Sequence, residues 1–142
     1  LNLARAIRSR LSTLNAQPST SLDIQETSEM GLSLLDFITG YDGLVVVDAV
    51  QTGQMPPGAM QEIDLESIQV LPATAPHFLG LGEIFALARE LGLPMPNRVK
   101  IFAIEVGDAF TVSTGMTEPL QQAFPSLVER LLVALEEMAR FR

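Results

Sequence analysis

The segment that most constrains the fold is LVVVDAV, residues 44–50, which opens with four consecutive apolar residues. Three of the four are valines, whose β-branched side chains favour strands because they pack well on a pleated surface. A strand that is apolar on both sides must be covered on both faces, as in a parallel sheet flanked by helices. A similar run, RVKIFAIEV at 98–106, predicts a second strand of that sheet.

Helical and weaker strand patterns surround these two runs. Apolar residues spaced three or four apart predict amphipathic helices. The predicted helices cover residues 1–14, 31–40, 78–91 and 118–141. Shorter alternating segments predict strands at 21–27 and 59–65. Within the last helix, Pro125 predicts either a kink or a split into two helices.

The order of these elements, α-β-α-β-β-α-β-α, predicts the fold class. Such alternation is typical of an α/β protein, here a three-layer α/β/α sandwich with a mostly parallel, twisted sheet of the phosphorylase/hydrolase-like type. A length of 142 residues fits a single domain over residues 1–142. Because such folds normally open with a strand, we expect that an N-terminal strand is missing from this sequence.

The composition excludes several classes of partner and site. The net charge is −8, which argues against nucleic-acid binding because phosphate contacts need a Lys/Arg surface. The chain has no cysteine, and therefore neither a disulfide nor a thiolate metal site. It contains no run of 18 apolar residues and no signal-peptide pattern. We therefore predict a cytoplasmic protein that does not associate with membranes.

Two residues are candidates for chemistry. Asp48 ends the valine-rich strand, and ligands of open α/β sheets bind beyond the carboxyl ends of strands. His77, the only histidine, precedes the third predicted helix and should lie near the same rim. Imidazole and carboxylate together suit Zn²⁺ or Ni²⁺, but two ligands hold an ion weakly. The alternatives are that Asp48 binds loop amides and that His77 merely packs at a helix start.

Glu105 is a second carboxylate at the end of a predicted strand. It is a candidate third ligand or base, but with no partner motif beside it we favour a solvated residue at the sheet rim. The sequence has no phosphate-binding glycine loop of the usual kinds and no G-x-S-x-G elbow for a serine nucleophile.

An ordered set of segments resembles the hydrogenase maturation proteases. The matching segments are MGLSLLDFI, LVVVDAVQTGQMPPG, PHFLGLGEIFALARELG, VKIFAIE and STGMTEPLQQAFPSLVERLL. The resemblance implies a five-stranded sheet with helices on both faces. It also implies an aspartic-type endopeptidase that removes the C-terminal extension of a [NiFe] hydrogenase large-subunit precursor after nickel insertion. By the same resemblance, Asp48 and His77 are two of three metal-binding side chains.

The resemblance further implies that the nickel is carried by the precursor and that Asp48 and His77 complete its coordination. Zinc or cadmium could replace it in a crystal. Either the metal or Asp48, as a general base, could activate the water. The family's opening strand and loop, of the form G-x-G-N with an acidic third ligand, have no counterpart in this sequence.

Two alternatives to a protease follow from the same residues. A catalytically inactive paralogue or binding module would keep the fold and lack the chemistry. A receiver-like signalling domain would place a phosphorylated aspartate after a hydrophobic strand, as Asp48 is placed. Receivers also need an acidic pair after the first strand and a lysine after the last, whereas Lys100 precedes its strand and no acidic pair follows a first strand here.

Overall fold

The computed structural model describes residues 3–13, 22–26, 31–64, 81–106 and 118–140 of the chain. Its elements, in chain order, are α1 (Leu3–Thr13), the 3-10 helix η1 (Gly31–Leu34), α2 (Leu35–Ile38), β1 (Gly43–Val50), β2 (Met60–Ile63), α3 (Leu81–Glu90), β3 (Arg98–Glu105) and α4 (Glu118–Arg140). Among these residues, no helix is both long and apolar enough to cross a bilayer.

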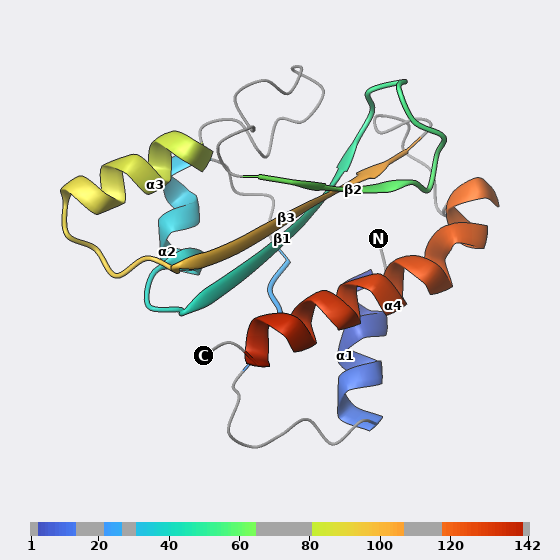
Figure 1. The fold of residues 1–142 in the computed structure, drawn as a ribbon, viewed down its shortest axis with the longest axis horizontal. Helices are drawn as coiled ribbons and strands as arrows, with labels where there is room; N and C mark the ends of the chain where they lie inside the picture. The colour runs from blue at the N-terminus through green and yellow to red at the C-terminus, as the bar shows by residue number, and fades with distance from the viewer. Residues whose placement is uncertain (1–2, 14–21, 27–30, 65–80, 107–117, 141–142) are drawn as a thin grey trace.

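The described strands form one mixed sheet in the order β1-β3-β2 (Figure 1). β1 runs parallel to β3, with Gly43 opposite Arg98 and Val50 opposite Glu105. β2 is antiparallel to β3, with Met60 opposite Ile104. An α/β protein is therefore confirmed, while the mostly parallel sheet and the complete three-layer arrangement stay predictions.

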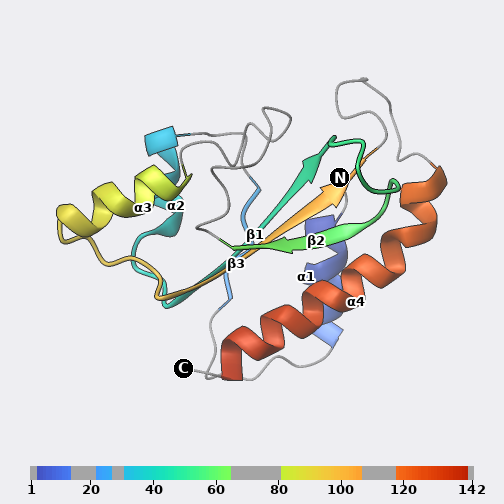
Figure 2. The ribbon, with the colours of Figure 1, turned by 45° about the horizontal axis from the view of Figure 1, so that its top comes forward.

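Side chains of β3 alternate between two hydrophobic clusters on opposite faces of the sheet. Phe102 and Ile104 pack in a cluster with residues of α1 and α4. Ile101 and Ala103 pack in the other, with residues of α2 and α3. Figures 1 and 2 show the same division, with α1 beside α4 on one side and α2 beside α3 on the other. The alternation follows from the two-residue period of a strand.

The two predicted apolar strands differ in burial. The last five residues of β3 are all buried, as the sequence predicted, whereas the first seven residues of β1 are only half-buried. Among the described residues β1 pairs with β3 alone, so it lies at an edge of this sheet. Val45 and Val47 pack against the cluster of α1 and α4, and Leu44 and Val46 pack against the cluster of α2 and α3, so apolar side chains contact a helical layer on both faces of β1, as predicted.

The final helix is continuous. Pro125 lies inside α4, so the predicted split into two helices is wrong. An internal proline removes one backbone hydrogen bond and weakens the helix locally. Four buried residues directly after it hold the helix on the sheet; they are Leu127, Val128, Leu131 and Leu132.

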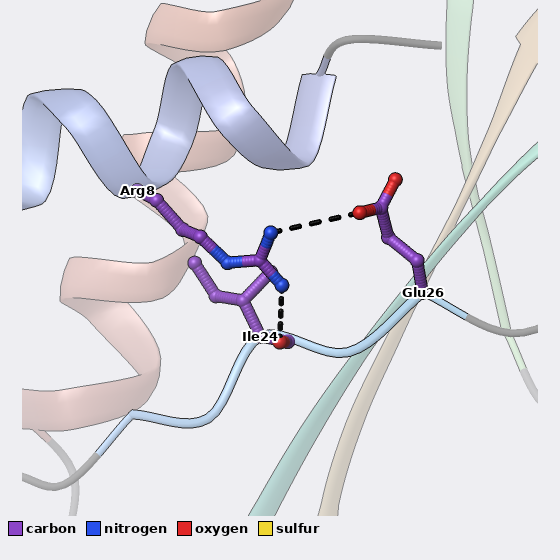
Figure 3. Close-up of polar contacts among 3 residues, drawn as sticks. All are labelled: Arg8, Ile24 and Glu26. Atoms are coloured by element: carbon purple, nitrogen blue, oxygen red, sulfur yellow. Dashed lines mark hydrogen bonds and ion pairs between the residues drawn. The ribbon is translucent and has the colours of Figure 1, made fainter.

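The predicted strand at 21–27 is also wrong within residues 22–26, which pair with no strand in the described chain. A strand needs a ladder partner for its amide and carbonyl groups. Side chains from elsewhere in the chain form polar contacts with this segment instead. Arg8 donates a hydrogen bond to the Ile24 carbonyl oxygen at 2.6 Å and lies 3.5 Å from the Glu26 carboxylate (Figure 3). The Tyr41 hydroxyl donates to Asp23 Oδ2 at 2.5 Å.

Tyr41 gives a pH-dependent test of this attachment. The hydrogen bond to Asp23, together with burial and the Asp23 charge, raises the pKa of Tyr41 above its ordinary value of 10.0. A raised folded pKa means that the contact contributes fully below the unfolded value and is lost as pH rises through the folded one. Tyr41 is the only tyrosine in the sequence, so tyrosinate absorbance reports on it alone.

We expect its titration midpoint above 10.0 in the wild-type chain and a lower midpoint in Asp23→Asn. Asp64→Asn, which changes an exposed carboxylate after β2, is the matched control and should leave the midpoint in place. Equal midpoints in wild type and Asp23→Asn would show that residues 22–26 are not held by Tyr41 in solution.

Candidate functional site at the carboxyl end of the sheet

Asp48 lies near the end of β1, opposite Ala103 of β3. Leu44 and Val46 of the same strand pack against the cluster of α2 and α3. Asp48 has the same parity along the strand, so its side chain is directed to that face. Its Oδ1 accepts a hydrogen bond from the Ala49 amide at 2.8 Å. Ala49 lies within β1, so this contact does not test the alternative that Asp48 binds amides of the following loop.

His77 lies outside the described residues, so whether it meets Asp48 is untested. The nearest described residue after it is Leu81, the first residue of α3. Leu81 is only 2% exposed and belongs to the same cluster as Val50 and Ala103. The start of α3 is therefore packed on the face of the sheet to which Asp48 is directed.

Glu105 is buried, with 4% exposure, so the favoured prediction of a solvated rim residue is wrong. Its Oε2 accepts hydrogen bonds from the amides of Thr52 (2.8 Å) and Gly53 (3.3 Å). Its Oε1 accepts a hydrogen bond from the Thr52 hydroxyl. A buried carboxylate is tolerated when such donors replace its water.

The reason for this burial is the sheet order. β1 and β2 flank β3, so the loop of residues 51–59 that joins them has to cross the carboxyl end of β3. Figures 1 and 2 show this loop arching past the end of β3. Glu105 is the last residue of β3 and is covered by the crossing chain. Thr52 and Gly53 were not predicted from the sequence as partners of Glu105. The available signal was that hydrogen-bond donors follow directly after a predicted strand.

Asp48 and Glu105 share a face of the sheet. Glu105 has the strand parity of Ile101 and Ala103, which pack on the α2 and α3 side. Among the described residues, no group of three or more His, Cys, Asp or Glu side chains is placed to hold a metal ion. A carboxylate such as that of Asp48 can accept a proton in a reaction.

The one lysine in the sequence bears on the receiver-like alternative. Lys100 has the parity of Phe102 and Ile104, which pack on the α1 and α4 face. Its Nζ lies 2.8 Å from the Glu137 carboxylate of α4. Lys100 therefore faces away from Asp48, which argues against phosphate binding of the receiver type.

Comparison with known proteins decides the family. The family model of hydrogenase maturation proteases matches residues 9–134. The chain belongs to that family. It is 24% identical over 118 residues to the hydrogenase 2 maturation protease of Escherichia coli K12, covering 82% of this chain and 71% of that protein.

Solved structures agree with this family. The hydrogenase maturating endopeptidase HybD from E. coli superimposes with a TM-score of 0.58 at 26% identity, over 75% of this chain and 66% of that one. An E. coli endopeptidase solved in solution gives a TM-score of 0.63 at 23% identity, over 94% and 85% of the two chains. This hydrogenase maturation protease therefore shares the fold of these proteins.

Proposed function

We propose that this chain is an endopeptidase that removes the C-terminal extension of a [NiFe] hydrogenase large-subunit precursor after nickel has been inserted. Family membership supports the peptidase class. The observation that carries the proposal is the position of Asp48, at the carboxyl end of β1 on the face where α3 begins. The proposed setting is the cytoplasm, which suits a chain without cysteine.

In this proposal Asp48 and His77 together contact the nickel that the precursor carries. Carboxylate and neutral imidazole are both suitable ligands for that ion. His77 is four residues before Leu81, and four extended residues span at most about 13–14 Å. Leu81 shares its cluster with Val50 and Ala103, the neighbours of Asp48 along and across the sheet. This reach supports a shared contact.

The proposed chemistry assigns one further role to Asp48. Nickel, as part of the substrate, contributes Lewis acidity when it is bound. Asp48 accepts a proton from the attacking water as the water adds to the scissile carbonyl carbon, and it returns the proton to the leaving amine as the C–N bond breaks. The step consumes one water and needs no other reactant.

His77→Ala is expected to lower processing of a nickel-loaded precursor about 100-fold or more, because a lost metal contact removes several kcal/mol of stabilisation. The appearance of the shortened large subunit on a gel measures the rate. The thermal unfolding midpoint of His77→Ala should match the wild type, which separates a lost ligand from a lost fold. Unchanged processing by a folded His77→Ala variant would refute the role of His77.

A non-catalytic binding module of the same fold is the second candidate. It would keep the packing of α3 and α4 on the sheet and bind the precursor without cleaving it. Binding of the nickel-loaded precursor without any shortened product, under conditions where a known maturation protease cleaves it, would support this alternative over the peptidase.

We also propose that the whole domain is a three-layer α/β/α sandwich with a mostly parallel sheet. The two hydrophobic clusters on opposite faces of β3 support the layers, and the β1–β3 ladder supports the parallel pairing.

A further inference from the structure

We infer that Glu105 is a positioning residue that clamps the loop of residues 51–59, and that the exposed tip of this loop is a docking element for the precursor polypeptide. The inference rests on the proposed function and goes beyond it by assigning a site of substrate contact outside the proposed metal ligands.

Glu105 holds the loop at both of its ends. At the beginning of the loop, its carboxylate accepts hydrogen bonds from the amides of Thr52 and Gly53 and from the Thr52 hydroxyl. Its backbone is hydrogen-bonded to the end of the loop. The Gly58 amide donates to the Glu105 carbonyl and the Glu105 amide donates to the Ala59 carbonyl, both at 2.8 Å. One buried residue therefore fixes the two points where the loop leaves the sheet.

Contacts within the loop extend the clamp. The Thr52 hydroxyl, which donates to Glu105, also accepts a hydrogen bond from the Gln54 amide at 3.1 Å. The Ala59 amide donates to the Pro56 carbonyl at 3.0 Å. Gly53 adopts a φ of 70°, a left-handed conformation in which most other residues are strained. These contacts and the turn define one conformation for the connection.

The tip of the loop, residues 53–57, is exposed, whereas Gly58 and Met60 beyond it are buried. The tip has the sequence GQMPP, and Met55 is 38% exposed. Two consecutive prolines have fixed φ angles, so they lose little conformational entropy when a partner binds. A methionine side chain adapts to irregular apolar surfaces. A rigid, uncharged tip that presents methionine and proline side chains suits an extended apolar stretch of polypeptide.

The position of the loop relative to Asp48 points to the precursor polypeptide as the partner. The loop begins directly after β1, three residues beyond Asp48, and Glu105 lies on the same face of the sheet as Asp48. A polypeptide bound with its scissile bond at Asp48 therefore passes beside the loop. Asp48 itself is held by the β1–β3 ladder, so loosening the loop should weaken substrate binding more than it slows the chemical step.

The test separates KM from kcat for processing of the nickel-loaded precursor. We expect Glu105→Ala to raise KM about tenfold with kcat within about twofold, since a loop that must be ordered on binding costs affinity and not chemistry. Glu105→Gln keeps an acceptor for the amides and a partner for the hydroxyl, so its KM should stay within about threefold of the wild type. Thr52→Val, which leaves Glu105 in place, should fall between the two.

Glu62→Ala is the matched control, because Glu62 is an exposed carboxylate on the neighbouring strand, opposite Phe102 and outside the loop of residues 51–59. It should change neither constant. A general loss of folded protein lowers the apparent kcat and leaves KM unchanged, so it cannot imitate the expected result. An unchanged KM in Glu105→Ala, or an equal loss of kcat in Glu105→Gln and Glu105→Ala, would overturn the inference.

Hydrogen exchange of the chain alone keeps this test independent of catalysis. The amides of Thr52 and Gly53 should exchange about tenfold faster in Glu105→Ala than in Glu62→Ala, because their acceptor is gone. If the wild type binds the precursor without cleaving it, the proposed function fails and the dissociation constant takes the place of KM. Equal exchange in the two variants, or equal affinity, would then refute the clamp by itself.

Discussion

Asp48→Asn is expected to lower precursor processing about a thousandfold, because a general base of this type contributes between about 10² and 10⁴. Asparagine has almost the same shape as aspartate. Its carbonyl oxygen can still accept the hydrogen bond that the Ala49 amide donates to Asp48 Oδ1 at 2.8 Å. It carries no negative charge and does not accept a proton from water. The substitution therefore removes the chemistry and leaves the strand in place.

Processing of nickel-loaded precursor by Asp48→Asn is compared with that of Asp64→Asn, in which an exposed carboxylate beyond the end of β2 is changed in the same way. Asp64→Asn should process at the wild-type rate, and both variants should unfold at the wild-type temperature. The proposed role is wrong if Asp48→Asn, folded and at equal concentration, processes within tenfold of the control. A variant that binds the precursor tightly and does not cleave it would agree with the proposal.

Phe85→Ala is expected to destabilise the fold by about 3–5 kcal/mol, the usual cost of removing a fully buried aromatic ring and leaving a cavity. Phe85 is 2% exposed and joins α3 to the cluster that contains Val50, Ile101 and Ala103. Small domains are stable by only about 5–15 kcal/mol, so one such change removes a large share of the total.

Denaturant unfolding measures this loss, and Leu91→Ala is the control. Leu91 directly follows α3 and is 63% exposed, so its truncation should change the unfolding free energy by no more than about 0.5 kcal/mol. Equal stability losses in the two variants would show that α3 does not pack on the sheet through Phe85. Because α3 follows the segment that contains His77, such a result would also weaken the proposed meeting of His77 and Asp48.

Local sequence pattern was sufficient for the main elements. The valine-rich run and the run ending at Glu105 both form strands, β1 and β3, and the amphipathic segments form α1, α3 and α4. Their periodicity is a property of short stretches of chain, so it can be detected without knowledge of the partners. The placement of Asp48 near a strand end follows from the same pattern.

Pairing between distant segments could not be predicted in the same way. Residues 22–26 have an alternating sequence, yet they form no strand in the described chain, because a ladder depends on a neighbour that local pattern does not specify. The order β1-β3-β2 and the antiparallel β2 are of this kind. Both determine which side chains are covered.

Glu105 shows the difference at the candidate site. By itself the sequence determined that a carboxylate ends the second apolar strand, because the hydrophobic period fixes where the strand runs. Only the tertiary structure decided that this carboxylate is buried and bonded to Thr52 and Gly53, because a loop crosses the end of β3 when β1 and β2 lie on either side of it. Burial is set by what the rest of the chain places over a residue, and that depends on contacts between segments far apart in the sequence.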